Sequence, residues 1–139
     1  MENTSSGWSI CWYKYWGIQE IENKDVILVD TIGHLSSLYQ YGDIGFIGGG
    51  FGKGLHNTLE AATFGLPVFF GPNHKKFREA LELIEVKAAF PVTNYKYFSS
   101  QMDKLLSDAN ALKKLSAVAE NYVKENTGAT RTIIDNTLR

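Results

Sequence analysis

The stretch from Ile44 to Gly71, IGFIGGGFGKGLHNTLEAATFGLPVFFG, decides the fold. It opens with the short apolar run Ile44 to Ile47, which is typical of a strand buried in a parallel sheet. Five glycines follow between Gly48 and Gly54. Apolar spacing then predicts a helix over His56 to Phe64, and a further buried strand at Val68 to Phe70. A strand, a tight glycine loop, a helix and a second strand in this order predict one unit of a parallel sheet.

The rest of the chain continues the alternation of strands and helices with short connections. A helix capped by Asn73 is predicted to carry an apolar stripe, and Asp108 is predicted to cap another helix. Strands are predicted at Trp8 to Trp16, Val26 to Val29 (buried on both faces) and Ala88 to Phe90, and helices at His34 to Tyr41, from Asn73 to Ile84, at Phe98 to Leu106, Ala109 to Lys124 and Thr130 to Leu138. The fold class is therefore α/β, a Rossmann-like parallel sheet flanked by helices, with residues 1–139 as a single domain and the fewest signals before residue 25.

Composition narrows the classes of function. The 139 residues are 44% hydrophobic and 21% charged, and the net charge is -1. So balanced a charge gives no support to binding of nucleic acid or of a membrane surface. The single cysteine, Cys11, cannot form an internal disulfide, and no signal peptide or membrane-spanning run is visible, so a cytoplasmic location is predicted. The three histidines are far apart in sequence, and no metal site is expected.

The glycine loop is the first candidate site. It lies directly after a buried strand and directly before a helix, where α/β sheets place their ligands. Glycine lets the backbone approach a ligand closely, and the N-terminus of the next helix offers N–H groups to a phosphate. Lys53 adds a positive charge within the loop. The pattern lacks both the dinucleotide fingerprint and the Gly-Lys-Ser/Thr ending of a P-loop, and a purely structural tight turn remains an alternative.

The helix after the loop carries the second set of candidates. His56, Asn57 and Glu60 are predicted to lie on one side of its first turn. His56 can donate to an anion, Asn57 can contact a phosphate or a sugar, and Glu60 can accept hydrogen bonds from a ribose diol. The alternatives are a local cap or core histidine for His56, and a charge that stabilises its own helix for Glu60.

Two other strand ends add residues to the predicted site. Ile32 and Gly33, in the turn after the strand at 26–29, are predicted to lie against a base, although Asp30 fits an ordinary turn equally well. The segment Gly71 to His74 borders the site or forms a plain turn. A solvated face is the favoured interpretation of Lys75, Lys76 and Arg78. Contact of these residues with an anionic sugar is the less favoured interpretation.

The run from Val29 to Leu83, VDTIGHLSSLYQYGDIGFIGGGFGKGLHNTLEAATFGLPVFFGPNHKKFREALEL, resembles the C-terminal domain of bacterial 3-deoxy-D-manno-octulosonic acid (Kdo) transferases, which have the GT-B fold. Asp-Thr-x-Gly, the triple glycine, His-Asn-x-Leu-Glu and Phe-Gly-Pro occur in the order typical of that family. The segment Leu38 to Gly42 is similar to the version in Bacteroidetes-type sequences. The chain departs from the family at His34 and at Trp12-Tyr13-Lys14, where many members have an acidic residue and an Arg-Ser pair.

The resemblance implies a donor site for CMP-Kdo without a cofactor or a metal. Asn57 and Glu60 would hold phosphate and ribose, and Ile32 and Gly33 would lie near the cytosine. The CMP phosphate would be surrounded by Gly48, Gly49, Gly50, Phe51, Gly52, Lys53 and Gly54.

For the whole enzyme, the resemblance implies transfer of Kdo to a lipid A precursor in lipopolysaccharide synthesis, at the cytoplasmic face of the inner membrane. The acceptor site, the membrane-associating segment and the general base would belong to an N-terminal domain outside this sequence, so the catalytic residue is not identified here. The chain is then expected to be a fragment that is inactive alone. Two alternatives stay open: a GT-B transferase or epimerase that uses a UDP-sugar, and a non-catalytic nucleotide-sugar-binding module.

Overall fold

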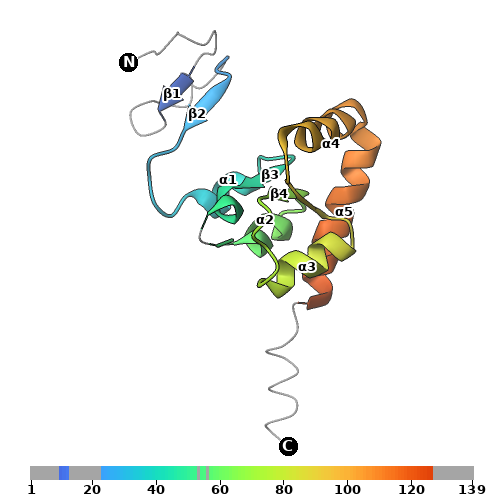
Figure 1. The fold of residues 1–139 in the computed structure, drawn as a ribbon. Coiled ribbons are helices and arrows are strands. Elements are labelled where there is room, and N and C mark those ends of the chain that lie inside the picture. The colour runs from blue at the N-terminus through green and yellow to red at the C-terminus, as the bar shows by residue number, and fades with distance from the viewer. Residues whose placement is uncertain (1–9, 13–22, 53, 56, 127–139) are drawn as a thin grey trace, which may run out of the picture. The chain divides into compact units, whose positions relative to one another are not determined.

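The computed structural model describes residues 10–12, 23–52, 54–55 and 57–126, and the chain divides into two compact units, Met1–Leu35 and Ser36–Arg139 (Figure 1). In the first unit, β1 (Ile10–Trp12) pairs in parallel with β2 (Val26–Leu28), with Ile10 opposite Val26. Both strands lie within their predicted ranges. The assignment of the whole chain to one domain stays a prediction.

The side chains of β2 are less buried than the sequence predicts. Ile27 is 43% exposed and Leu28 is 37% exposed, so the strand is not buried on both faces in this structure. In the described part of the chain, β1 is the strand hydrogen-bonded to β2. A sheet of two strands leaves much of its apolar surface in contact with water. The apolar run therefore predicted the strand correctly but not its burial.

The second unit is built on a parallel three-stranded sheet in the order β3-β4-β5. Gly45 of β3 lies opposite Val68 of β4, and Val68 lies opposite Ala89 of β5. The elements in chain order are α1 (Leu35–Tyr39), which begins at the boundary of the units, β3 (Gly45–Ile47), the 3-10 helix η3 (Gly48–Phe51), α2 (Thr58–Thr63), β4 (Val68–Phe70), α3 (Arg78–Glu85), β5 (Ala89–Pro91), α4 (Tyr95–Ser107) and α5 (Ala109–Asn126).

The central strand β4 explains the layered architecture. Val68, Phe69 and Phe70 are all 0% exposed. Val68 and Phe70 belong to the cluster that includes residues of α2, α3 and α5, whereas Phe69 belongs to the cluster with α4. Because alternate side chains of a strand point to opposite faces, one short apolar run fills both cores. The predicted α/β sheet flanked by helices is confirmed.

The helix boundaries follow local capping. The Asp108 carboxylate accepts hydrogen bonds from the backbone N–H groups of Asn110 (3.0 Å) and Ala111 (2.9 Å), so the predicted cap is confirmed. The helix before it begins at Tyr95, three residues earlier than predicted, because Asn94 caps it through a bond from the Tyr97 N–H (2.9 Å). The predicted helix at residues 130–138 lies outside the described residues.

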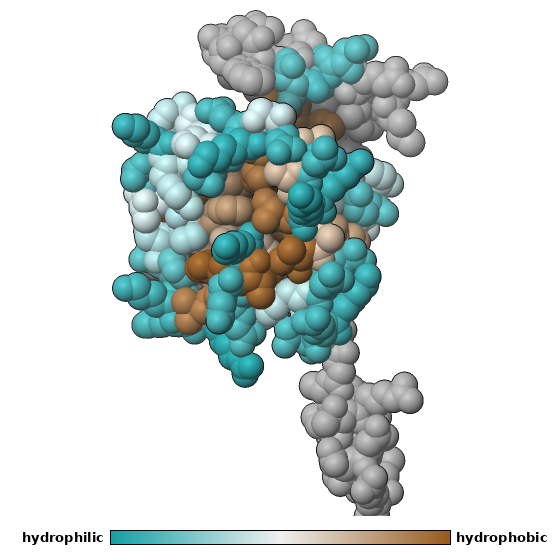
Figure 2. All heavy atoms as spheres, turned by 90° about the vertical axis from the view of Figure 1, so that its right-hand side faces the viewer, coloured by the Kyte–Doolittle hydropathy of each residue, from teal (hydrophilic) through white to brown (hydrophobic). Residues whose placement is uncertain are grey.

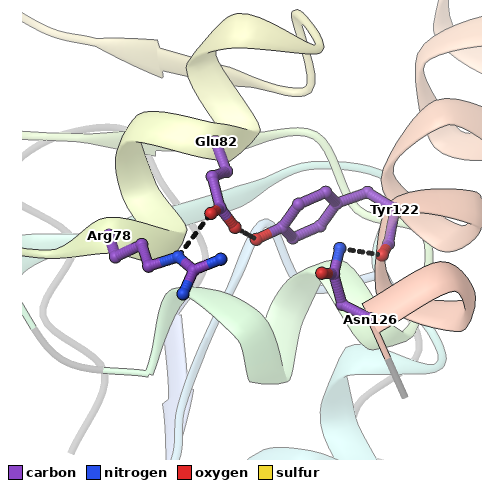
Figure 3. A network of polar contacts seen from close by, with 4 residues as sticks. All are labelled: Arg78, Glu82, Tyr122 and Asn126. Atoms are coloured by element: carbon purple, nitrogen blue, oxygen red, sulfur yellow. Dashed lines mark hydrogen bonds and ion pairs between the residues drawn. The ribbon is translucent and has the colours of Figure 1, made fainter. Parts of the chain in front are cut away.

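Helices α3 and α5 are joined by a polar contact (Figure 3). The Tyr122 hydroxyl donates to Glu82 Oε2 at 2.5 Å, and Arg78 Nε donates to Glu82 Oε1 at 2.6 Å. These two hydrogen bonds, the tyrosine's first, lower the pKa of Glu82 below its usual value. Burial and then the bond to Glu82 raise the pKa of Tyr122. The contact therefore needs an ionised Glu82 and a neutral Tyr122.

The surface combines polar groups with exposed apolar ones. On the face drawn in Figure 2, apolar side chains gather in the centre and hydrophilic side chains surround them.

Phe46 in β3 is 53% exposed, so the expectation of a fully buried strand at residues 44–47 is wrong for this side chain. In the described part of the chain β3 is an edge strand of its sheet, and the Phe46 ring contacts Phe51 and Phe98 instead of a further strand.

Candidate functional site

The glycine loop leaves β3 as a single 3-10 turn. Gly48 follows Ile47 directly, and the turn closes with the Gly52 N–H donating to the Gly49 carbonyl at 3.1 Å. Leu55, only 2% exposed, anchors the end of the loop in the core. The loop thus lies at the carboxyl end of β3, which is the edge of a parallel sheet where ligands bind. The prediction that the loop directly follows a strand is confirmed, whereas the next helix begins at Thr58 rather than at His56.

The loop lies against the chain segment that follows β4. A Cβ atom at Gly50 would lie 2.7 Å from the backbone nitrogen of Gly71, and one at Gly71 would lie 2.3 Å from the carbonyl carbon of Gly50. Both distances are far shorter than a carbon side chain allows, and the atoms they meet are backbone atoms. These two glycines are therefore required by the close approach of two strand ends.

Asn73 ties the same two segments together. Its backbone N–H donates to the Gly50 carbonyl at 3.0 Å, and its side-chain Nδ2 donates to the Gly52 carbonyl at 3.1 Å. The prediction that Asn73 caps a helix is wrong, because α3 begins at Arg78 after an extended Phe77. The residue types Pro and Asn at positions 72 and 73 signal a turn, but local sequence does not reveal its partner 21 residues away.

The remaining loop residues have different surroundings. Gly48 and Gly52 have open space where a Cβ would be, so their backbones are accessible to a ligand. The Phe51 ring stacks on Phe46 with centroids 5.9 Å apart, and the Phe51 side chain is 51% exposed. Lys53 lies outside the described residues.

The predicted cluster at the start of α2 is only partly formed. Glu60 lies in the first turn of α2, half-buried. Asn57 precedes the helix in the left-handed region, with φ 57°, and its exposed side chain makes no capping bond, so the prediction that it lies on the first turn is wrong. The helix α2 begins one residue later, at Thr58. His56 lies outside the described residues.

Glu60 lies close enough to the ring of Tyr39 to affect its ionisation. Burial, and secondly the negative charge of Glu60, raise the pKa of Tyr39. The Glu60 carboxylate is therefore within electrostatic reach of the Tyr39 hydroxyl.

Ile32 and Gly33, the residues predicted to lie against a base, belong to the first unit of the chain. Ile32 is fully exposed, and Gly33 has a φ of 93° with open space around it. A positive φ explains why glycine ends this turn. The hydroxyl oxygen of Thr31 is buried without a hydrogen-bond partner among the described residues. That Ile32 and Gly33 lie beside the glycine loop stays a prediction.

A pocket of about 560 Å³ opens beside the glycine loop. It is lined by Gly52, Gly54, Pro72, Asn73, Lys75, Lys76 and Phe77. Lys75 and Lys76 are exposed, as the sequence predicts for a solvated face, but they also border this pocket. Arg78 does not line it and instead contacts Glu82 within α3.

The described residues show no second candidate for a ligand or metal site with support comparable to that of the glycine loop. A depression of about 630 Å³ follows one face of α4 and shares no lining residue with the glycine loop. Within the described ranges, no three side chains of the metal-binding types gather at one point. None of the helices there is both long and apolar enough to cross a bilayer.

These features define an α/β domain of the Rossmann-like class, with a glycine-rich loop at the carboxyl end of one of its parallel strands. By sequence, the chain belongs to the 3-deoxy-D-manno-octulosonic acid transferase family. The enzyme of that name from Rickettsia prowazekii is 35% identical over 118 residues, which are 84% of this chain and 25% of the relative. The Aquifex aeolicus enzyme is 40% identical over 91 residues (64% of this chain, 26% of the relative), and the Haemophilus influenzae enzyme is 32% identical over 117 residues (82% and 27%).

The fold has a counterpart among solved structures. The C-terminal CMP-Kdo binding domain of WaaA from Acinetobacter baumannii is similar with a TM-score of 0.66 at 20% sequence identity, over 84% of this chain and 62% of that one. No family model matches the chain. The chain spans about a quarter of the length of the curated relatives that it matches.

Proposed function

We propose that this chain is the donor-binding part of a Kdo transferase and that its glycine loop binds CMP-Kdo. The observation that carries the proposal is the loop itself, which follows β3 and is held against the end of β4 by Gly50, Gly71 and Asn73. A loop held in one conformation presents backbone N–H groups without a further ordering cost on binding. The relationship to Kdo transferases and the similar fold of a CMP-Kdo binding domain support the choice of nucleotide.

In this proposal each part of the site has a distinct role. Backbone N–H groups at Gly48 and Gly49 contact the phosphate, and Glu60 accepts hydrogen bonds from the ribose hydroxyls. Asn57 contacts phosphate or ribose, and Ile32 with Gly33 lies near the cytosine. The same donors stabilise the negative charge that builds on CMP as it leaves, without a metal.

The whole protein, in this proposal, transfers Kdo to a lipid A precursor at the cytoplasmic face of the inner membrane. In the same proposal, an N-terminal domain outside this chain supplies the general base that deprotonates the acceptor hydroxyl. This chain then supplies donor binding and leaving-group stabilisation.

An NMR titration of the isotope-labelled chain tests the donor class. We expect CMP to shift the amide signals of residues 48–60 and to bind more tightly than UDP. A preference for UDP would instead assign the chain to a transferase or epimerase that uses a UDP-sugar. Shifts confined to other parts of the chain would contradict the proposed site.

A pair of matched variants tests the role of Glu60. Glu60→Gln removes the charge that accepts two ribose hydroxyl bonds, and we expect it to weaken CMP binding about 10-fold, the usual effect of losing a charged hydrogen-bond partner. Glu125→Gln, an exposed position in α5, makes the same chemical change and should leave the affinity for CMP unaltered. Equal affinities in the two variants would exclude Glu60 from the site.

A further inference from the structure

The pocket beside the glycine loop suggests which group of the donor lies next to the nucleotide. An octulosonic acid carries a carboxylate, so a donor formed from CMP and this sugar has two anionic groups, one phosphate and one carboxylate. We propose that the pocket lined by Lys75 and Lys76 binds the carboxylated sugar and makes the site selective for acidic sugars. This inference rests on the proposed function and extends it from the nucleotide to the sugar.

The position of the pocket fits a group attached to the phosphate. Gly52 and Gly54 of the loop form one part of its lining, and Pro72 and Asn73 of the opposite segment form another. A ligand whose phosphate contacts the loop therefore has this pocket within reach of one of the two groups attached to the phosphate. The volume of about 560 Å³ is within the range that small-molecule sites occupy.

The charges around the pocket favour an anion. Lys75 and Lys76 both line it, and no carboxylate does so among the described residues. Among the described residues, the ammonium groups of Lys75 and Lys76 have no ion-pair partner. The neighbouring Arg78, in contrast, is paired with Glu82 at 2.6 Å. Two ammonium groups that line one pocket, both without an ion-pair partner in the described part of the chain, attract a carboxylate and give no comparable advantage to a neutral sugar.

The segment that carries the two lysines is held in place at both ends. Asn73 bonds to the carbonyl groups of Gly50 and Gly52, and the Phe77 N–H donates to the His74 carbonyl at 2.9 Å. Phe77 also packs against the main hydrophobic core while lining the pocket. The lysine stems thus start from a fixed backbone, which reduces the entropy lost when their ammonium groups contact a ligand.

The test compares two ligands, CMP and CMP-Kdo, by calorimetric titration of the whole chain. We expect the unmodified chain to bind CMP-Kdo more tightly than CMP. In the double variant Lys75→Gln/Lys76→Gln the ratio of the two affinities should fall about fivefold to tenfold, the sum expected for two exposed ion pairs. The double variant Lys75→Arg/Lys76→Arg keeps both charges and should keep the ratio.

Lys113→Gln/Lys114→Gln is the matched control. It removes two adjacent lysines from an exposed face of α5 that does not line the pocket, and it should leave the ratio of affinities unchanged. Because ion pairs at a surface are screened, raising the salt concentration should also reduce the ratio in the unmodified chain and not in Lys75→Gln/Lys76→Gln.

The outcomes separate this inference from the function on which it rests. If CMP binds at the glycine loop but the glutamine variant at 75 and 76 keeps the full ratio, the acidic-sugar pocket is refuted and the nucleotide site stands. If the unmodified chain binds neither ligand at the loop, both proposals fail. A loss of the ratio in the 113 and 114 variant would refute the inference as well, because a general effect of charge would then explain the result.

Discussion

Gly50 and Gly71 set how closely the loop after β3 approaches the segment after β4. Each would bring a Cβ atom to within 3 Å of the other's backbone. The two residues lie at the ends of neighbouring parallel strands, and Asn73 adds two hydrogen bonds to the same contact. The conformation of the proposed phosphate loop therefore depends on single residues in a segment outside the loop.

A pair of glycine variants tests this dependence. Gly50→Ala forces a methyl group into backbone atoms 2.7 Å away, and we expect it to lower the free energy of unfolding by about 1–3 kcal/mol, the usual cost of overpacking. Gly48→Ala places its methyl group in open space and should change stability by less than about 0.5 kcal/mol. Urea unfolding followed by circular dichroism measures both. Equal losses in the two variants would show that the contact between the strand ends contributes nothing.

Helix α5 is held against α3 by an apolar core and by a polar contact at the edge of that core. Ala119 and Tyr122 of α5 are buried with Ala80 and Leu83 of α3 in the same cluster. The Tyr122 hydroxyl, at the border of that cluster, finds its partner in Glu82. A buried tyrosine usually satisfies its hydroxyl in this way, because an unpaired hydroxyl away from water is costly.

The contact between the helices makes stability depend on pH. The pKa of Glu82 is held below its usual 4.5, first by the Tyr122 bond, so its contribution to stability is present above about pH 4.5 and is lost as the pH falls through the lower, folded-state pKa. Tyr122→Phe should therefore be less stable than the unmodified chain at pH 7, and the difference should shrink in acid. Thermal unfolding between pH 3 and 7 measures this.

Tyr95→Phe is the control for that measurement. Its hydroxyl is on a side chain that is 81% exposed, so the substitution removes the same atom without breaking the contact between the helices. We expect no pH-dependent loss of stability in this variant. A difference between Tyr122→Phe and the unmodified chain that stays constant from pH 3 to 7 would contradict the role given to Glu82.

At the scale of the whole molecule, the chain spans only part of the length of its relatives. It matches about a quarter of each curated Kdo transferase. The three parallel strands, their helices and the glycine loop belong to the second unit, whereas Ile32 and Gly33 belong to the first. In the proposed function, the loop of the second unit binds the nucleotide, and transfer needs an acceptor site and a general base as well.

An activity assay tests the proposal that this chain binds the donor nucleotide but does not contain the general base. We expect the purified chain to bind CMP and to transfer no sugar from CMP-Kdo to a lipid A precursor, because the proposed base belongs to another part of the relatives. Formation of labelled product is the readout, with a full-length relative as the positive control. Turnover by the chain alone would show that its own residues include the base.

Local sequence was sufficient for several features that depend on neighbouring residues. The apolar run at Val68 to Phe70 predicted the central strand, and Asp108 predicted the start of α5, because periodic burial and capping act within a few residues. The five glycines after β3 predicted a loop at the end of that strand, because a strand followed by glycines and a helix is a local pattern. The order of the motifs also carried the family resemblance.

Tertiary structure alone decided which distant segments meet. The parallel register brings Gly71 against Gly50 and Asn73 against Gly52, so Asn73 holds the loop instead of capping a helix. It also leaves Phe46 exposed on an edge strand and turns the Lys75 and Lys76 segment toward a pocket. These facts follow from the packing of strands more than 20 residues apart, and no periodicity within a short window encodes them.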